Sequence, residues 1–139
     1  MKAPFCILLA LSVGLGYCTS PNRIPNLQER LIGKWQAHTT RSVEMDSVGQ
    51  VLFERTDSSQ YCVEFTPKEV LYYFYRDPAQ VSKRTLYTLS DTLITLKDKE
   101  LWIKIAVQEL TDSHLVLRQA LPGLAHTTLT STITYTRIP

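Results

Sequence analysis

Histidine, cysteine and carboxylate side chains are the groups that most often carry catalysis or bind metal, and in this chain they are widely spaced. The three histidines are His38, His114 and His126, and none has a second His, Cys or carboxylate at the spacing of a metal site. Cys62 has no base nearby in the pattern that would activate its thiol. No glycine-rich phosphate loop is present. We therefore expect no catalytic site, no metal and no cofactor, and a protein that is not an enzyme.

Aromatic residues are the remaining candidates for a functional site. A tyrosine offers both apolar area and a hydroxyl, which suits an amphipathic ligand. Side-chain alternation along the predicted strands places six aromatic residues on interior faces: Tyr61, Phe65, Tyr73, Tyr75, Tyr87 and Tyr135. Two interpretations stay open, because these rings either line a ligand cavity or fill a narrow barrel.

The elements that must position these rings are a short helix and then almost entirely strands. The helix is predicted over residues 26–32, with Asn26 as its N-cap and Glu29 placed to reach back to the cap. Gly33 takes the backbone conformation that ends a helix. Alternating apolar and polar residues then predict eight strands: 34–41, 60–65, 70–76, 83–89, 92–97, 101–108, 114–119 and 129–138. A hairpin arm at 50–55 is predicted to follow the first of them.

Short connections decide how these strands are arranged. A short turn forces its two strands to lie antiparallel and side by side, and strands with one apolar face need a closed or stacked structure. We therefore predict an all-β fold, an up-and-down antiparallel barrel of about eight strands with a short N-terminal helix, over residues 26–139. A two-sheet sandwich is the alternative, but its crossovers need longer connections.

Residues at the two ends of this pattern are the most specific. The order is a short helix, then Gly33-Lys34-Trp35, a meander, and Arg137 in the last strand. This order resembles the lipocalin superfamily, and more closely the short lipocalin-like lipoproteins of bacterial envelopes. The resemblance covers residues 26–138 and implies that Gly33, Trp35 and Arg137 close one end of the barrel. Trp35 would plug that end and the Arg137 cation would pack over its ring.

The chain before residue 26 is predicted to direct export rather than to join the fold. Residues 1–17 are predicted to be a signal peptide, because Lys2 is followed by an apolar, almost uncharged segment over 5–17 that is too short to cross a bilayer. Cys18 closes this segment and resembles the lipidated cysteine of a bacterial lipobox, with residues 18–25 as a polar tether. The resemblance implies a membrane-anchored lipoprotein of the bacterial cell envelope. Cleaved export, as a periplasmic or secreted soluble protein, is the alternative.

The rim of the barrel away from Trp35 is the predicted open mouth, because the connections of a meander alternate between the two rims. Three connections are expected to gather there: 76–82, 98–99 and 120–127. The last is the apolar one and carries Leu121 and Leu124, so we expect it to act as a lid or docking surface.

The partner is the least determined feature of the chain. A net charge of +2 with scattered basic residues argues against nucleic acid. The expected function is a membrane-tethered, extracytoplasmic lipocalin-like binding module for a small apolar or amphipathic ligand. The alternative is a filled barrel that acts as a protein-interaction or inhibitor subunit at the cell envelope.

Overall fold

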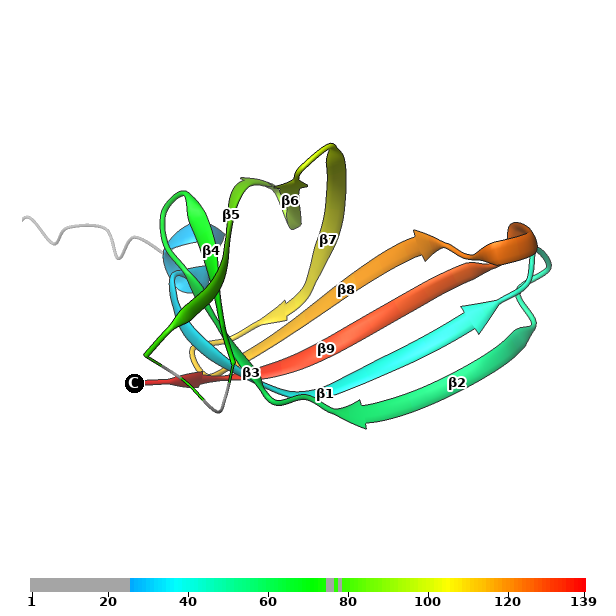
Figure 1. The fold of residues 1–139 in the computed structure, drawn as a ribbon, viewed down its shortest axis with the longest axis horizontal. Coiled ribbons are helices and arrows are strands. Elements are labelled where there is room, and N and C mark those ends of the chain that lie inside the picture. Colours follow the sequence, from blue (N-terminus) through cyan, green and yellow to red (C-terminus); the bar gives the residue numbers. More distant parts are fainter. Residues whose placement is uncertain (1–25, 75–76, 78) are drawn as a thin grey trace, which may run out of the picture.

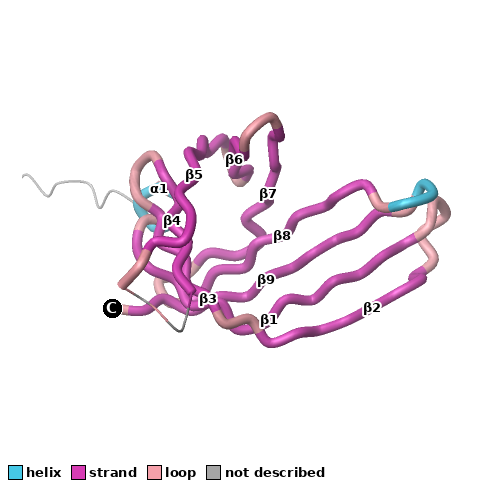
Figure 2. Tube along the Cα trace, viewed as in Figure 1, coloured by secondary structure: helices cyan, strands magenta, loops and turns pink. Residues whose placement is uncertain are grey.

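A computed structural model of the protein describes residues 26–74, 77 and 79–139. Almost all of the described chain is strand (Figures 1 and 2). In chain order the elements are α1 (Leu27–Leu31), β1 (Gly33–Met45), β2 (Val51–Ser58), β3 (Tyr61–Phe65), β4 (Glu69–Phe74), β5 (Val81–Ser90), β6 (Leu93–Asp98), β7 (Leu101–Leu110), β8 (His114–Pro122), the short 3-10 helix η1 (Leu124–His126) and β9 (Thr128–Ile138).

The strands form a closed barrel. Each strand from β3 to β9 pairs antiparallel with the next in sequence, β1 pairs with β3, and β9 returns to pair with β1. Eight strands therefore close on themselves without free edges in the barrel wall. The prediction of an up-and-down antiparallel barrel with a short N-terminal helix is confirmed, and no crossover of the sandwich type joins these strands.

One further strand, β2, lies outside the closed barrel. It pairs with the second half of β1, which continues past the barrel together with β8 and β9 (Figure 1). These four strands, in the order β2-β1-β9-β8, form a single-layered sheet that we call the extension: residues 39–45, 51–58, 118–122 and 128–134. The predicted hairpin arm at 50–55 is thus confirmed, but it is longer than expected. Residues 56–58 and 120–122, predicted as loops, are strand because they pair along the extension.

β1 changes its neighbour at His38. Gln36 lies opposite Cys62 of β3, whereas Thr39 lies opposite Ser58 of β2. The register between β1 and β9 shifts at the same point, with His38 as the additional residue. A bulge of this kind bends a strand and increases its twist. The bend lets one continuous strand serve first the barrel wall and then the extension.

The hydrophobic core lies in the half of the barrel near α1. The largest fully buried side chains come from α1 and five barrel strands: Leu31, Trp35, Val63, Val70, Ile94 and Leu115. Each such burial contributes about 1.5–3 kcal/mol relative to an exposed side chain. Phe65 and Tyr87 pack edge to face within this core, with ring centroids 5.6 Å apart. The core thus fills one end of the barrel and leaves the other end as the place to look for a site.

Candidate functional site

The filled end of the barrel is sealed by Trp35. Its side chain is fully buried, and its indole N–H donates to the carbonyl of Leu31 at the end of α1 (N···O 2.9 Å). The Arg137 guanidinium lies over the ring, with Cζ 4.2 Å from the ring centroid. The closed end that the resemblance implied for these two residues is therefore present, since both occupy adjacent positions of β1 and β9.

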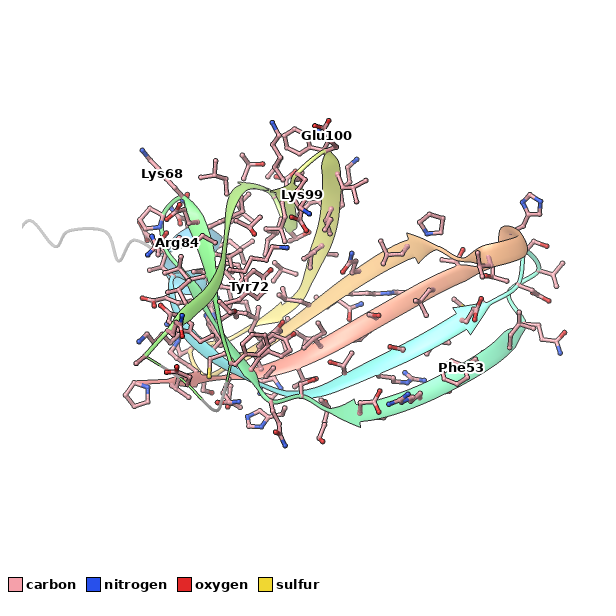
Figure 3. All side chains as sticks on the ribbon, in the orientation of Figure 1. Phe53, Lys68, Tyr72, Arg84, Lys99 and Glu100 are labelled. Atoms are coloured by element: carbon pink, nitrogen blue, oxygen red, sulfur yellow. The ribbon has the colours of Figure 1, made fainter. Side chains whose placement is uncertain are left out.

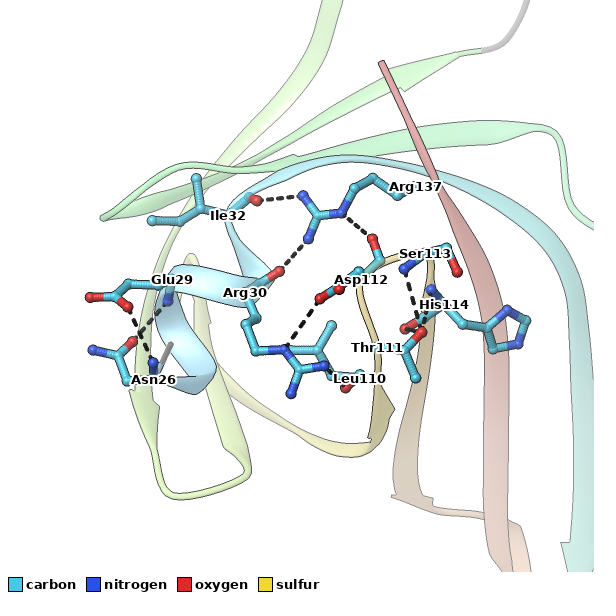
Figure 4. A network of polar contacts seen from close by, with 10 residues as sticks. All are labelled: Asn26, Glu29, Arg30, Ile32, Leu110, Thr111, Asp112, Ser113, His114 and Arg137. Atoms are coloured by element: carbon cyan, nitrogen blue, oxygen red, sulfur yellow. Dashed lines mark hydrogen bonds and ion pairs between the residues drawn. The ribbon is translucent and has the colours of Figure 1, made fainter. Parts of the chain in front are cut away.

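The Arg137 guanidinium also binds three backbone carbonyls from two segments of the chain (Figure 4). Nε donates to the Asp112 carbonyl at 2.7 Å, Nη1 donates to the Ile32 carbonyl at 2.9 Å, and Nη2 donates to the Arg30 carbonyl. Gly33 makes room for this arrangement, because a Cβ at that position would lie 2.5 Å from Nη1. One cation thus fastens the end of α1 to the β7–β8 turn across the bottom of the barrel.

Beyond the core the barrel encloses a cavity of about 140 Å³. Most of its wall is aliphatic: Ile94, Leu96, Ile103, Ile105, Leu117 and Ile133. Ile94 is fully buried, whereas Ile103 and Ile133 are half-buried. The cavity therefore opens toward the rim away from Trp35, which is the predicted mouth.

Tyrosine hydroxyls supply much of the polar surface of this cavity. The Tyr61 and Tyr135 hydroxyls hydrogen-bond to each other at 3.0 Å, and their rings pack edge to face with centroids 6.1 Å apart. Tyr72 also lines the cavity from β4 (Figure 3), and its hydroxyl has no hydrogen-bond partner among the described residues. Burial, with smaller contributions from Tyr61 and Asp98, raises the pKa of Tyr72 to about 12. Burial also raises the pKa of Tyr61 and, more strongly, that of Tyr135, so all three hydroxyls keep their protons at neutral pH.

The opposite wall carries a polar row where the barrel passes into the extension. Gln119 of β8 lies opposite Ser131 of β9, which in turn lies opposite Ser42 of β1. Gln119 and Ser131 line the cavity, and the two serine hydroxyls are 3.5 Å apart. The Gln119 carboxamide has no hydrogen-bond partner among the described residues. We call Tyr72, Gln119 and Ser131 the mouth belt.

Several charged side chains near the mouth are paired with each other. Lys83 of β5 and Asp98 of β6 form an ion pair with Nζ and Oδ2 2.6 Å apart. On the adjoining inner face of the extension, Arg55 and Asp57 are paired at 2.6 Å, and Glu44 accepts a hydrogen bond from the Thr127 hydroxyl. The mouth belt therefore offers hydroxyls and an amide to a ligand, and the Lys83 and Asp98 charges are paired with each other.

The predicted aromatic residues divide between inside and outside. Tyr61, Phe65 and Tyr135 line the cavity as expected. Tyr87 lies inside but deeper, where it packs on Phe65 and its hydroxyl donates to the Thr66 carbonyl (O···O 2.7 Å). Tyr75 lies outside the described residues.

Tyr73 corrects the predicted interior set. Its hydroxyl donates to the Glu64 carboxylate at 2.7 Å, and the Lys34 ammonium lies 5.5 Å from its ring centroid, both on the outside of the barrel. The predicted interior position of Tyr73 was wrong. β4 pairs with β3 in a register that places Tyr72 opposite Val63, so Tyr72 points inward and Tyr73 points outward. Val70 could have indicated the inward position of Tyr72, because Val70 is buried and residues two apart on a strand share a face.

The apolar connection after β8 is farther from the cavity than predicted. Leu121 belongs to β8 and Leu124 to η1, and both lie toward the far end of the extension (Figure 1). Their neighbour there is the β1–β2 turn, because Thr127 hydrogen-bonds to Glu44 near the end of β1 (O···O 2.5 Å). The segment 120–127 is therefore on the side of the barrel away from Trp35, but it does not gather with the β6–β7 turn at the mouth.

The groups that catalysis or metal binding would use remain scattered. Among the described residues, no three His, Cys, Asp or Glu side chains approach closely enough to hold a metal ion. Cys62 is buried, its thiol lies 3.0 Å from the Gln36 carboxamide oxygen, and burial raises its pKa, which disfavours the reactive thiolate. In the described part of the chain, no helix is long and apolar enough to span a bilayer. No protein-family model and no curated protein matches this chain by sequence.

Proposed function

We propose that this barrel is a binding module for a small apolar or amphipathic molecule. The observation that carries the proposal is the cavity, which is apolar over most of its wall and bears hydroxyl groups. Its volume of about 140 Å³ is below the range of drug-sized sites, about 300–1,000 Å³. It is close to that of an apolar cavity of about 150 Å³ that binds benzene. The buried part of the ligand is therefore a single ring or a short alkyl group, and the remainder lies at the mouth.

A lipocalin-like, extracytoplasmic setting is part of the same proposal. It is supported by the Trp35–Arg137 arrangement at the closed end and by the signal-like residues 1–17 with Cys18 after them. If Cys18 carries a lipid anchor, Cys18→Ala releases the protein from membranes and removes the acyl mass from its N-terminus. Wild-type protein cleaved elsewhere, with an unmodified Cys18, would show that the anchor is wrong without touching the binding proposal.

Toluene tests the cavity because it has the size of the proposed buried group and no polar atom. The full-length protein is expected to bind toluene in ligand-observed NMR. Ile105→Phe adds a ring to the cavity wall and should weaken that binding at least fivefold. Lys104→Phe is the matched control, because the neighbouring residue of β7 is exposed. Equal binding by both variants, or no binding by the wild type, would contradict the proposal.

A second function is favoured by the tip of the extension. Val48 in the β1–β2 turn and Leu124 in η1 are 85% and 88% exposed, and Leu52 nearby on β2 is also exposed. Exposed apolar side chains gathered at one place mark docking surfaces in many soluble proteins. On this proposal the barrel is a scaffold, and the tip binds another protein as an interaction or inhibitor subunit. A photo-crosslinking residue at Val48, compared with one at Lys104, tests it in cells.

A further inference from the structure

We propose that the ligand of the cavity carries an uncharged hydrogen-bonding group, such as an alcohol, ester or amide, which binds the mouth belt while its apolar end fills the cavity. This inference rests on the binding function proposed above and assigns a chemical class to the ligand. It is carried by the position of the belt, by its unpartnered polar atoms and by the pairing of the nearby charges.

The belt can contact a ligand from two sides. Tyr72 lies on β4, whereas Gln119 and Ser131 lie on β8 and β9. In the strand order of the closed barrel β4 and β8 are four strands apart, which places them on opposite walls. All three residues line the cavity. Three of the aliphatic wall residues, Ile94, Leu96 and Leu117, are buried, whereas the belt residues are half-buried. A ligand whose apolar end packs on the buried part therefore leaves its polar group near these side chains.

Two members of the belt have hydrogen-bonding capacity to spare. The Tyr72 hydroxyl and the Gln119 carboxamide have no partners among the described residues. A half-buried polar group without a partner costs free energy unless water or a ligand satisfies it. Together they offer a hydroxyl donor and an amide that both donates and accepts, which matches an alcohol or a carbonyl.

The charges at the mouth disfavour an ionic ligand. The Lys83 ammonium is already paired with Asp98, and Arg55 is paired with Asp57. A carboxylate ligand between the belt residues would lie near the Asp98 carboxylate, whose charge also acts on Tyr72. An ammonium ligand there would have to compete with Lys83 for the Asp98 carboxylate. Because the raised pKa of Tyr72 keeps its hydroxyl protonated, the belt itself is neutral.

Three probes of similar size separate these possibilities: toluene, benzyl alcohol and benzoate. The full-length protein is expected to bind toluene and benzyl alcohol and to bind benzoate at least tenfold more weakly than benzyl alcohol. Tyr72→Phe should weaken benzyl alcohol binding about fivefold to tenfold, as expected for one lost hydrogen bond, and should leave toluene binding unchanged or improved. Gln119→Leu is a second variant with the same expected pattern.

Tyr73→Phe is the matched control, because it removes the same hydroxyl from the next residue of β4 on the outside of the barrel. It should change the binding of neither probe. If toluene binds but benzyl alcohol binding is unaffected by both Tyr72→Phe and Gln119→Leu, the neutral-group inference is overturned and the binding module stands. Tighter binding of benzoate than of benzyl alcohol overturns it as well. If the wild type binds no probe, the proposed binding function fails with it.

Discussion

Arg137 and Trp35 occupy paired positions of β9 and β1, and the guanidinium of the first covers the indole of the second at 4.2 Å. The same guanidinium donates to three backbone carbonyls. Trp35 fills the bottom of the barrel, and Arg137 fastens the helix and the β7–β8 turn over it. The two residues therefore have separate roles, burial for one and fastening for the other.

Substitutions at this pair should differ in cost. Trp35→Ala removes a fully buried ring and is expected to destabilise the protein by about 3–5 kcal/mol. Arg137→Ala leaves the core filled and should cost less, about 1–3 kcal/mol, because hydrogen bonds and the cation–ring contact are lost. Urea unfolding measures both. Arg118→Ala, at an exposed position of β8, is the control and should stay within about 0.5 kcal/mol of the wild type. A stable Trp35→Ala protein would contradict the assigned role.

Gly33→Ala and Gly49→Ala test whether the Arg137 guanidinium needs the space that a glycine leaves at position 33. Both glycines have positive φ, +130° and +86°, but only Gly33 faces Arg137, while a Cβ at Gly49 meets nothing within 4 Å. Gly49→Ala should cost about 1 kcal/mol, from the backbone alone. Gly33→Ala should cost about 3 kcal/mol, because the guanidinium must also move.

A double variant isolates the clash between the new methyl group and the guanidinium. Gly33→Ala combined with Arg137→Ala should be less destabilised than the sum of the two single variants, since the clash disappears with the arginine. Strict additivity in urea unfolding would show that Gly33 is needed for its backbone conformation only.

Local patterns made the closed end predictable from sequence. The N-cap and capping box of Asn26 and Glu29 are present as predicted, with the Glu29 N–H donating to the Asn26 side chain at 2.8 Å. The alternation from 129 to 138 correctly placed Tyr135 inward. These features depend on residues a few positions apart, or on strand ends that the meander brings together.

The polar wall of the cavity could not be predicted in the same way. Residues 72–75 are all aromatic, so alternation alone does not say which of Tyr72 and Tyr73 faces inward. The choice depends on the pairing of β4 with β3, where Tyr72 lies opposite Val63. Gln119 reads as an ordinary polar strand residue, and only the closure of the barrel brings it opposite Tyr72. The length of the extension was underestimated from the sequence. β2 is exposed along most of its length, so its sequence does not show the alternating apolar face by which the other strands were predicted.

Alkaline pH should destabilise the protein through its buried tyrosines. An unfolded tyrosine has a pKa of about 10, whereas that of Tyr72 in the folded protein is about 12, and burial raises those of Tyr61, Tyr87 and Tyr135 as well. Below pH 10 both states hold the proton, and stability does not depend on these groups. Above it the unfolded state loses protons that the folded state keeps, so stability falls with rising pH until the folded pKa is passed.

The slope of that decline is measurable by urea unfolding across this range. Each such tyrosine should contribute about 1.4 kcal/mol per pH unit between its unfolded and folded pKa. Tyr72→Phe should make the decline shallower by about that amount between pH 10 and about 12. An unchanged slope in Tyr72→Phe would mean that this hydroxyl is not buried as the cavity geometry requires.

The tip of the extension should be separable from both the fold and the cavity. Leu124 is 88% exposed, so Leu124→Asp should change stability by less than about 0.5 kcal/mol. Val48→Asp in the adjoining turn is the companion variant. Leu117→Ala, in the buried core, is the contrast and should cost about 2–5 kcal/mol.

Because Leu124 belongs to neither the cavity wall nor the mouth belt, toluene binding should be unchanged in both tip variants. A protein partner that docks on the tip should instead lose affinity in both, because a charge replaces an apolar contact. Loss of toluene binding in Leu124→Asp, with stability intact, would return this segment to the ligand site as the lid that the sequence predicted.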